Sequence, residues 1–201
     1  MKFVFSKIKC SDLDQRGFSL VELLITIGIV IMVTGAVLVR HTSFNSSTLL
    51  KSQAFELSLD IRTAQQYSIS ARADRTDTRA AYGVYFDAQI PGQYQLFLDA
   101  DDDSMYDPGE EVGLANALDS RFFIKEICHQ NATARQCSDR RKGSVAFKRP
   151  NFDAIIRTSW ADGSNYGVSN RTWIDVVIAS VDDVNTTRTV TVYQTGQIGV
   201  Q

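Results

Sequence analysis

Two hydrophobic patterns follow one another in the first part of the chain. Residues 18–39, FSLVELLITIGIVIMVTGAVLV, are predominantly apolar, and their only charge is Glu22. At about 1.5 Å per residue, a helix of this length spans the roughly 30 Å hydrocarbon core of a bilayer. Further on, small or apolar residues recur at alternating spacings of four and three: Leu50, Ala54, Leu57, Ile61, Ala64 and Ser68. The two patterns predict one long helix over residues 18–72, with 18–39 in the membrane and a later apolar face against a sheet.

The pattern changes after Arg72 to short runs rich in β-branched and aromatic residues. The runs are AAYGVYF, QYQLFLD, RFFIKEI, GSVAFK, TWIDVVIAS and TRTVTVYQTGQIGV. They predict strands, with hairpins at IPGQ between the first two runs and at TGQ near the end. Residues 73–201 are therefore expected to form a β-rich globular domain, and the chain is predicted to be α+β with an antiparallel sheet.

Composition narrows the classes of function. The 201 residues are 44% hydrophobic and carry a net charge of -2, which is typical of a globular protein and offers no case for bulk nucleic-acid binding. The only histidines are His41 and His129, and there is no Gly-x-Ser-x-Gly elbow, glycine-rich phosphate loop or zinc spacing. An enzymatic function is not expected. Cys128 and Cys137 are spaced to close a small disulfide loop in an oxidising compartment.

Charges around the apolar segment predict its orientation. Lys2, Lys7, Lys9 and Arg16 precede the segment and Arg40 follows it, so the positive-inside rule leaves the N-terminus in the cytoplasm and exports the rest. A plain signal-anchor helix would explain the same pattern. Glu22 argues against that simpler reading, because a carboxylate in the bilayer costs roughly 2.5 to 3.5 kcal/mol and is normally kept for a cationic partner.

The stretch RGFSLVELL, residues 16–24, resembles the prepilin signature of type IV pilins and type II secretion pseudopilins. The resemblance implies that residues 1–17 are a leader, that a prepilin peptidase cuts after Gly17 and methylates Phe18, and that Glu22 pairs with a neighbouring subunit's N-terminus. It further implies a pilin-like fold, other pilin or pseudopilin subunits as partners, and an inner-membrane assembly platform. The protein would be a single-pass precursor in the bilayer of the bacterial inner membrane and then part of an extracytoplasmic filament.

Later segments are similar to the GspH/FimT branch of pilin-like proteins. They are AFELSLDIRTAQQYSISAR, YGVYF, FLDADDDSMYDPGEEV and TGQIGV. The resemblance implies a pilin, minor pilin or pseudopilin of a type IV pilus or type II secretion filament. Two alternatives stay open at this point: a DNA-binding minor pilin and a plain membrane-anchored β-domain.

Two charged clusters are candidate binding sites. Calcium is the only cofactor expected: in DADDDSMYDPGE, residues 99–110, carboxylates stand at positions 1, 3, 5, 9 and 12, as in a calcium loop of the EF-hand type. The candidate ligands are Asp99, Asp101, Asp103, Asp107 and Glu110. Ser104 replaces the usual glycine, and a solvated acidic turn is the alternative. A basic cluster could meet DNA phosphates, although a solvated surface is commoner. It consists of the segment RRKG, Arg140–Gly143, with Lys148, Arg149 and Arg157 nearby.

Overall fold

The computed structural model describes residues 17–70, 81–131, 134–160 and 171–201, without the side chains of residues 39–45 and Asn131. It divides into two compact units, Met1–Ser43 and Phe44–Gln201. The described elements are one helix followed by antiparallel strands, which confirms the predicted α+β, pilin-like layout. The predicted leader lies outside the described residues except for Gly17.

The helix predicted over residues 18–72 is α1, which the structure places at Leu20–Ile69. It begins directly after Ser19, whose carbonyl oxygen accepts the Leu23 N–H at 3.1 Å. Serine is a preferred N-cap residue, and Glu22 stands at the third helical position, which is the spacing of a capping box. A carboxylate in the first turn also lies favourably in the field of the helix dipole.

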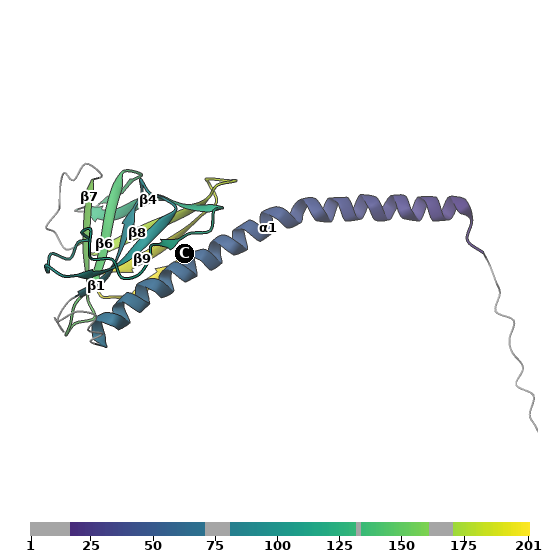
Figure 1. Cartoon of the computed structure of the whole chain (residues 1–201). Coiled ribbons are helices and arrows are strands. Elements are labelled where there is room, and N and C mark those ends of the chain that lie inside the picture. Colours follow the sequence, from purple (N-terminus) through teal and green to yellow (C-terminus); the bar gives the residue numbers. More distant parts are fainter. Residues whose placement is uncertain (1–16, 71–80, 132–133, 161–170) are drawn as a thin grey trace, which may run out of the picture. The chain divides into compact units, whose positions relative to one another are not determined.

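The globular unit contains the second half of α1 and two five-stranded antiparallel sheets (Figure 1). The first sheet has the order β3-β2-β1-β6-β7 and the second the order β10-β9-β8-β4-β5. The strands are β1 Ala81–Asp87, β2 Gln93–Asp99, β3 Asn116–Ala117, β4 Phe122–Asn131, β5 Ala134–Ser138, β6 Arg141–Phe147, β7 Ala154–Trp160, β8 Trp173–Ser180, β9 Thr187–Tyr193 and β10 Ile198–Val200.

The predicted hairpins at both ends of the domain are present. Strands β1 and β2 pair antiparallel around the IPGQ turn, and β9 and β10 pair around the terminal TGQ turn, where Gly196 has a φ of 80°. An added Cβ at Gly196 would lie 2.2 Å from the Phe152 carbonyl oxygen, so this turn has room only for glycine. The structure adds β3, β5 and β7, which the sequence patterns did not predict.

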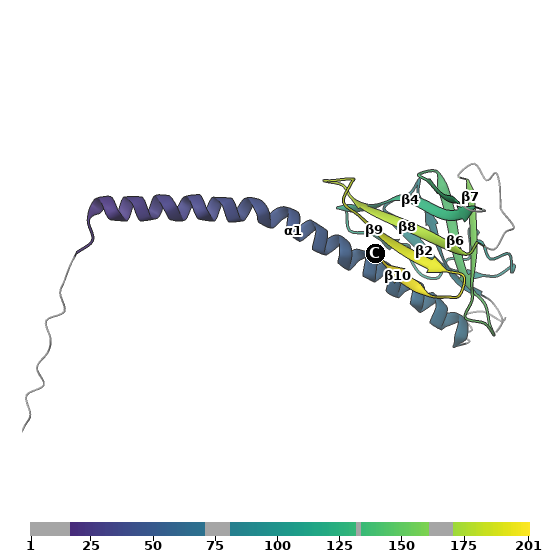
Figure 2. The same ribbon diagram turned by 180° about the vertical axis from the view of Figure 1, so that it is seen from behind.

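The apolar face predicted on the second half of α1 lies in the main core. Leu50, Ala54, Leu57, Ile61 and Ala64 have no exposed surface. They pack in one cluster with residues of both sheets, among them Val84 and Phe147 of the first sheet and Ile178 and Val192 of the second. Seen from behind, β9 and β10 lie beside this part of the helix (Figure 2). The Arg188 guanidinium reaches the Ser47 hydroxyl at 3.4 Å on the same side.

An irregularity in β4 decides which side chains of this strand face the core. Phe122 and Ile124 belong to the core cluster, and strict alternation would place Glu126 and Cys128 beside them. The pairing with β8 shifts register between Ile124 and Glu126, which is the signature of a β-bulge. After the bulge Ile127 faces the core, so His129 follows it inward and Cys128 points to the outer face.

Candidate functional site

The residues of the predicted processing site stand at the start of the helix. Gly17, Phe18 and Ser19 precede α1, and Phe18 is 82% exposed. Glu22 is exposed in the first turn. In the uncut chain Phe18 lies before the helix, and Glu22 lies in its first turn. The charged residues of the leader, up to Arg16, lie outside the described residues.

The first half of α1 is apolar on every side, and its described side chains are exposed. Residues Leu20–Leu38 are long and apolar enough to cross a membrane, and none of them is buried. Leu24 is 67% exposed and Met32 is 80% exposed. Because a helix that is hydrophobic all round requires an apolar environment, this half needs lipid or other protein chains around it. Glu22 is the only charged side chain in it.

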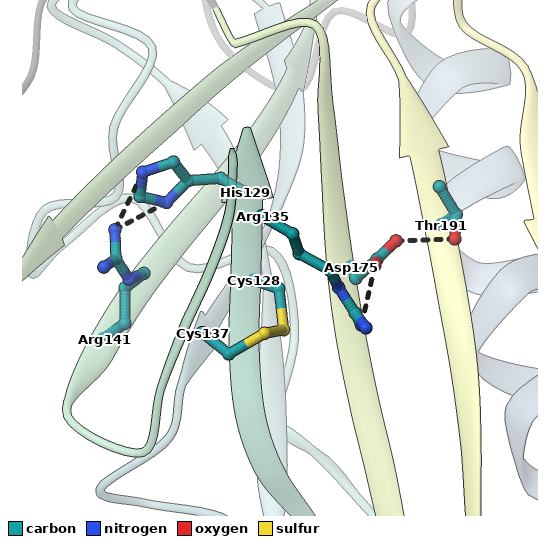
Figure 3. Close-up of a disulfide and its surroundings, with 7 residues drawn as sticks. All are labelled: Cys128, His129, Arg135, Cys137, Arg141, Asp175 and Thr191. Atoms are coloured by element: carbon teal, nitrogen blue, oxygen red, sulfur yellow. Dashed lines mark hydrogen bonds and ion pairs between the residues drawn. A yellow bond between two sulfur atoms is a disulfide. The ribbon is translucent and has the colours of Figure 1, made fainter. Parts of the chain in front are cut away.

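The predicted disulfide joins Cys128 of β4 to Cys137 of β5. The two residues are direct cross-strand partners on the outer face of the second sheet (Figure 3). Beside them Asp175 accepts a hydrogen bond from the Thr191 hydroxyl at 2.6 Å. The Asp175 carboxylate also forms an ion pair with Arg135 at 2.9 Å. The disulfide therefore ties the edge strand β5, whose side chains are mostly exposed, to its neighbour β4.

Part of the predicted calcium loop converges. Carboxylate oxygens of Asp99, Asp101 and Asp103 lie within 4.8 Å of one another. Asp99 is 2% exposed and accepts the backbone N–H groups of Asp103 and Ser104 at 3.1 and 3.0 Å. Burial, with the nearby carboxylate of Glu110, raises the pKa of Asp99 to about 6.

The other two predicted ligands lie outside that group. Both carboxylate oxygens of Glu110 accept backbone N–H groups, from Ala100 at 2.7 Å and from Asp107 at 3.0 Å. Glu110 thus closes the loop on itself. Calcium binding by Asp99, Asp101, Asp103, Asp107 and Glu110 together stays a prediction.

The basic cluster is divided rather than gathered on one surface. Arg140 is exposed, but Arg141 is only 5% exposed and faces His129. The Lys142 ammonium lies 3.6 Å from the Asp87 carboxylate, and Lys148 forms an ion pair with Asp102. Apart from the exposed Arg140, a phosphate backbone would therefore meet Arg141, which is buried, and Lys142 and Lys148, which are already paired with carboxylates.

The buried contact between His129 and Arg141 was missed by the sequence analysis. His129 has 1% of its surface exposed and its pKa is lowered to about 4, first by burial and then by the charges of Arg141 and Arg171. The sequence contains a partial indication that His129 faces inward, because it follows the apolar Ile127 by two residues, which is the spacing of one face of a strand. The bulge that turns both residues inward could not be read from the sequence.

Comparison with known families agrees with the N-terminal geometry. A family model described as Prokaryotic N-terminal methylation motif matches residues 13–38. The match covers the predicted cleavage site after Gly17, Phe18, Glu22 and the exposed apolar segment Leu20–Leu38. Residues 13–38 thus carry the N-terminal motif of type IV pilin-like and pseudopilin precursors, and they include the apolar helix segment Leu20–Leu38, which is long enough to cross a membrane. Neither a curated protein nor a solved structure matches the chain significantly.

Proposed function

We propose that this protein is a structural subunit, not an enzyme, of a type IV pilus or a type II secretion filament. The observation that carries the proposal is the first half of α1, which exposes apolar side chains on every side and bears a single carboxylate near its start. In the membrane this half is surrounded by lipid. In a filament the same surface packs against the helices of neighbouring subunits, and the globular unit faces outward.

Glu22 supplies the registry of the filament. Cleavage after Gly17 creates an α-amino group on Phe18, four residues before the carboxylate. A neighbouring subunit displaced along the axis brings its amine to this carboxylate, and the two opposite charges pair in a low-dielectric setting. Apolar contacts alone tolerate sliding, whereas an ion pair favours one axial offset. Methylation of the amine leaves its positive charge in place.

The proposed partners follow from this route. A prepilin peptidase processes the precursor, an inner-membrane platform extracts it from the bilayer, and other pilins or pseudopilins accept it into the polymer. The exported globular unit is stabilised by the Cys128–Cys137 disulfide, which suits an oxidising compartment.

Within this class we place the protein in the GspH/FimT branch. The support is the order of features along the chain: the second helix half, the β1–β2 hairpin, the acidic loop after β2 and the terminal β9–β10 hairpin. A DNA-binding minor pilin would differ from this reading by salt-dependent binding to DNA. The divided basic cluster does not favour that alternative.

Leader processing tests the proposal. The full-length precursor is co-expressed with a prepilin peptidase, and the N-terminus of the product is determined by mass spectrometry. The expected product begins at methylated Phe18, and a Gly17→Val variant should keep Met1. A plain membrane anchor would keep Met1 in both proteins. Assembled filaments built from chains with an intact Met1 would contradict the proposal.

A further inference from the structure

One end of the space between the two sheets is polar instead of apolar. There β4 contributes His129, β6 contributes Arg141, and β7 contributes Thr158 and Trp160. His129, Arg141 and Thr158 are 1%, 5% and 2% exposed. His129 and Arg141 face each other on the side of β4 away from the disulfide (Figure 3). Ile127 and Ile174, which belong to the apolar core cluster, lie next to this polar end.

Arg141 is held in place but is not fully bonded. Its Nη1 lies 2.5 Å from Nδ1 and 3.1 Å from Nε2 of His129, and its guanidinium carbon lies 4.7 Å from the centre of the Trp160 ring. The Thr158 hydroxyl lies 3.5 Å from the same Nδ1. Because arginine offers only donors, the contact requires a neutral His129 that accepts a hydrogen bond. The Arg141 Nε is buried and has no hydrogen-bond partner within the described ranges of the chain.

A second guanidinium adds positive charge to this end. Arg171, just before β8, donates from Nη1 to the Gln130 carbonyl at 3.4 Å, and its buried Nε also has no partner among the residues that the structure describes. Its charge, after burial, lowers the pKa of Arg141. In the part of the chain that the structure describes, no carboxylate forms an ion pair with Arg141 or Arg171. A buried cation without a counter-charge is costly, so an anion beside the buried Arg141 and the partly buried Arg171 would remove a penalty.

We propose that the polar end of the inter-sheet space binds a small oxyanion, a phosphate or carboxylate group, between Arg141, Arg171 and Thr158. The Nε of each guanidinium has no hydrogen-bond partner among the described residues. The planar guanidinium suits oxyanions, and the Thr158 hydroxyl adds a neutral donor. The burial of Arg141 and Thr158 limits the ligand to a small group and separates this site from the surface contacts that a DNA strand would need. The inference is independent of filament assembly.

One competitor for the site is a carboxylate of the chain itself. Residues 161–170, which connect Trp160 to Arg171, lie outside the described residues, and Asp162 is the only acidic residue in their sequence. If Asp162 neutralises the guanidinium groups, no external ion is needed. The Asp162→Asn variant therefore belongs in the test.

Thermal unfolding of the full-length protein in detergent tests the proposal. Phosphate is titrated at neutral pH against sodium chloride of matched ionic strength, and acetate replaces phosphate in a third series. Because a ligand that binds only the folded state stabilises it by mass action, the melting temperature should rise by several degrees with phosphate or acetate and not with chloride. The two oxyanions show whether a phosphate or a carboxylate group is preferred.

Variants assign the effect to the site. Arg171→Gln should abolish the phosphate response, Arg171→Lys should keep part of it in a folded protein, and Arg140→Gln, at the exposed neighbour of Arg141, should leave it unchanged. Phosphate should also raise the pKa of His129, which NMR of the imidazole measures. Equal shifts with phosphate, acetate and chloride, or a full phosphate response in Arg171→Gln, would overturn the proposal. So would a response that appears only in Asp162→Asn.

Discussion

The two halves of α1 place similar side chains in opposite surroundings. In the first half Leu24 and Ile31 are 67% and 66% exposed, whereas in the second half Leu57 and Ile61 have no exposed surface. The second half obtains its apolar environment from the two sheets of its own chain. The first half has no such cover and must find it in lipid or in other subunits. One continuous helix thus joins a region that folds by itself to a region that is completed by assembly.

The sharpest way to break this comparison is to truncate one leucine in each half. Leu57→Ala should lower the free energy of unfolding of the globular unit by about 2 to 5 kcal/mol, because it leaves a cavity in the main core. Leu24→Ala should leave that free energy unchanged, since Leu24 is exposed and does not belong to the core cluster. Denaturant unfolding of both full-length variants in detergent measures the difference. Equal losses in the two variants would show that the halves do not differ.

The disulfide concerns only the region that folds by itself. Replacing Cys128 and Cys137 together by serine should cost roughly 2 to 3 kcal/mol, because the bridge restricts a loop of about ten residues in the unfolded chain. Leader cleavage should be unaffected. Unfolding in the presence and absence of a reductant provides the measurement: wild-type protein should be weakened by the reductant and the double variant should not. A reductant effect of the same size in both proteins would show that the disulfide does not stabilise the globular unit.

Acid should weaken the globular unit through His129, which contacts Arg141 and Thr158 and also lies in the field of the Arg171 charge. Folding lowers the pKa of His129 from 6.5 to about 4, so between these values only the unfolded chain takes up the proton. The stability that depends on neutral His129 is fully present above the unfolded pKa and is lost as the pH falls towards about 4. His129→Gln should show a shallower decline of unfolding free energy over this range in phosphate-free buffer. Parallel pH profiles would contradict this prediction.

Calcium should have the smallest effect, on the acidic loop of the globular unit. Asp99, Asp101 and Asp103 bring three carboxylates together, and a divalent cation would neutralise them. Calcium should raise the melting temperature by a few degrees. Asp101→Asn, which keeps the oxygen that accepts the Asp103 N–H, should lose this rise, and Asp182→Asn, at an exposed acid elsewhere, should keep it. If calcium does not raise the melting temperature of the wild type, the loop is a solvated acidic turn and not a calcium site.

Periodicity was enough to predict the parts of the fold that depend on burial of whole faces. The face from Leu50 to Ser68 and the strands with β-branched runs were predictable because their side chains repeat at helix or strand spacing. Strand β5 was not, because ARQCS has no apolar alternation and its extended form depends on pairing with β4. The inward turn of His129 depends on a one-residue bulge, which changes no composition or period. Gly17, Phe18 and Glu22 were identified because their spacing forms a local motif.

The fate of Glu22 variants tests the central claim most directly. Glu22→Ala removes the carboxylate, and Glu22→Gln removes its charge but keeps an oxygen that can cap the helix. Glu56→Ala, at an exposed glutamate in the second half of α1, is the matched control. Each variant is expressed with the assembly machinery, and sheared filaments are compared with membranes. If the charge pair drives assembly, both Glu22 variants are cleaved normally but accumulate in the membrane, while Glu56→Ala enters filaments. Normal amounts of either Glu22 variant in filaments would contradict the account.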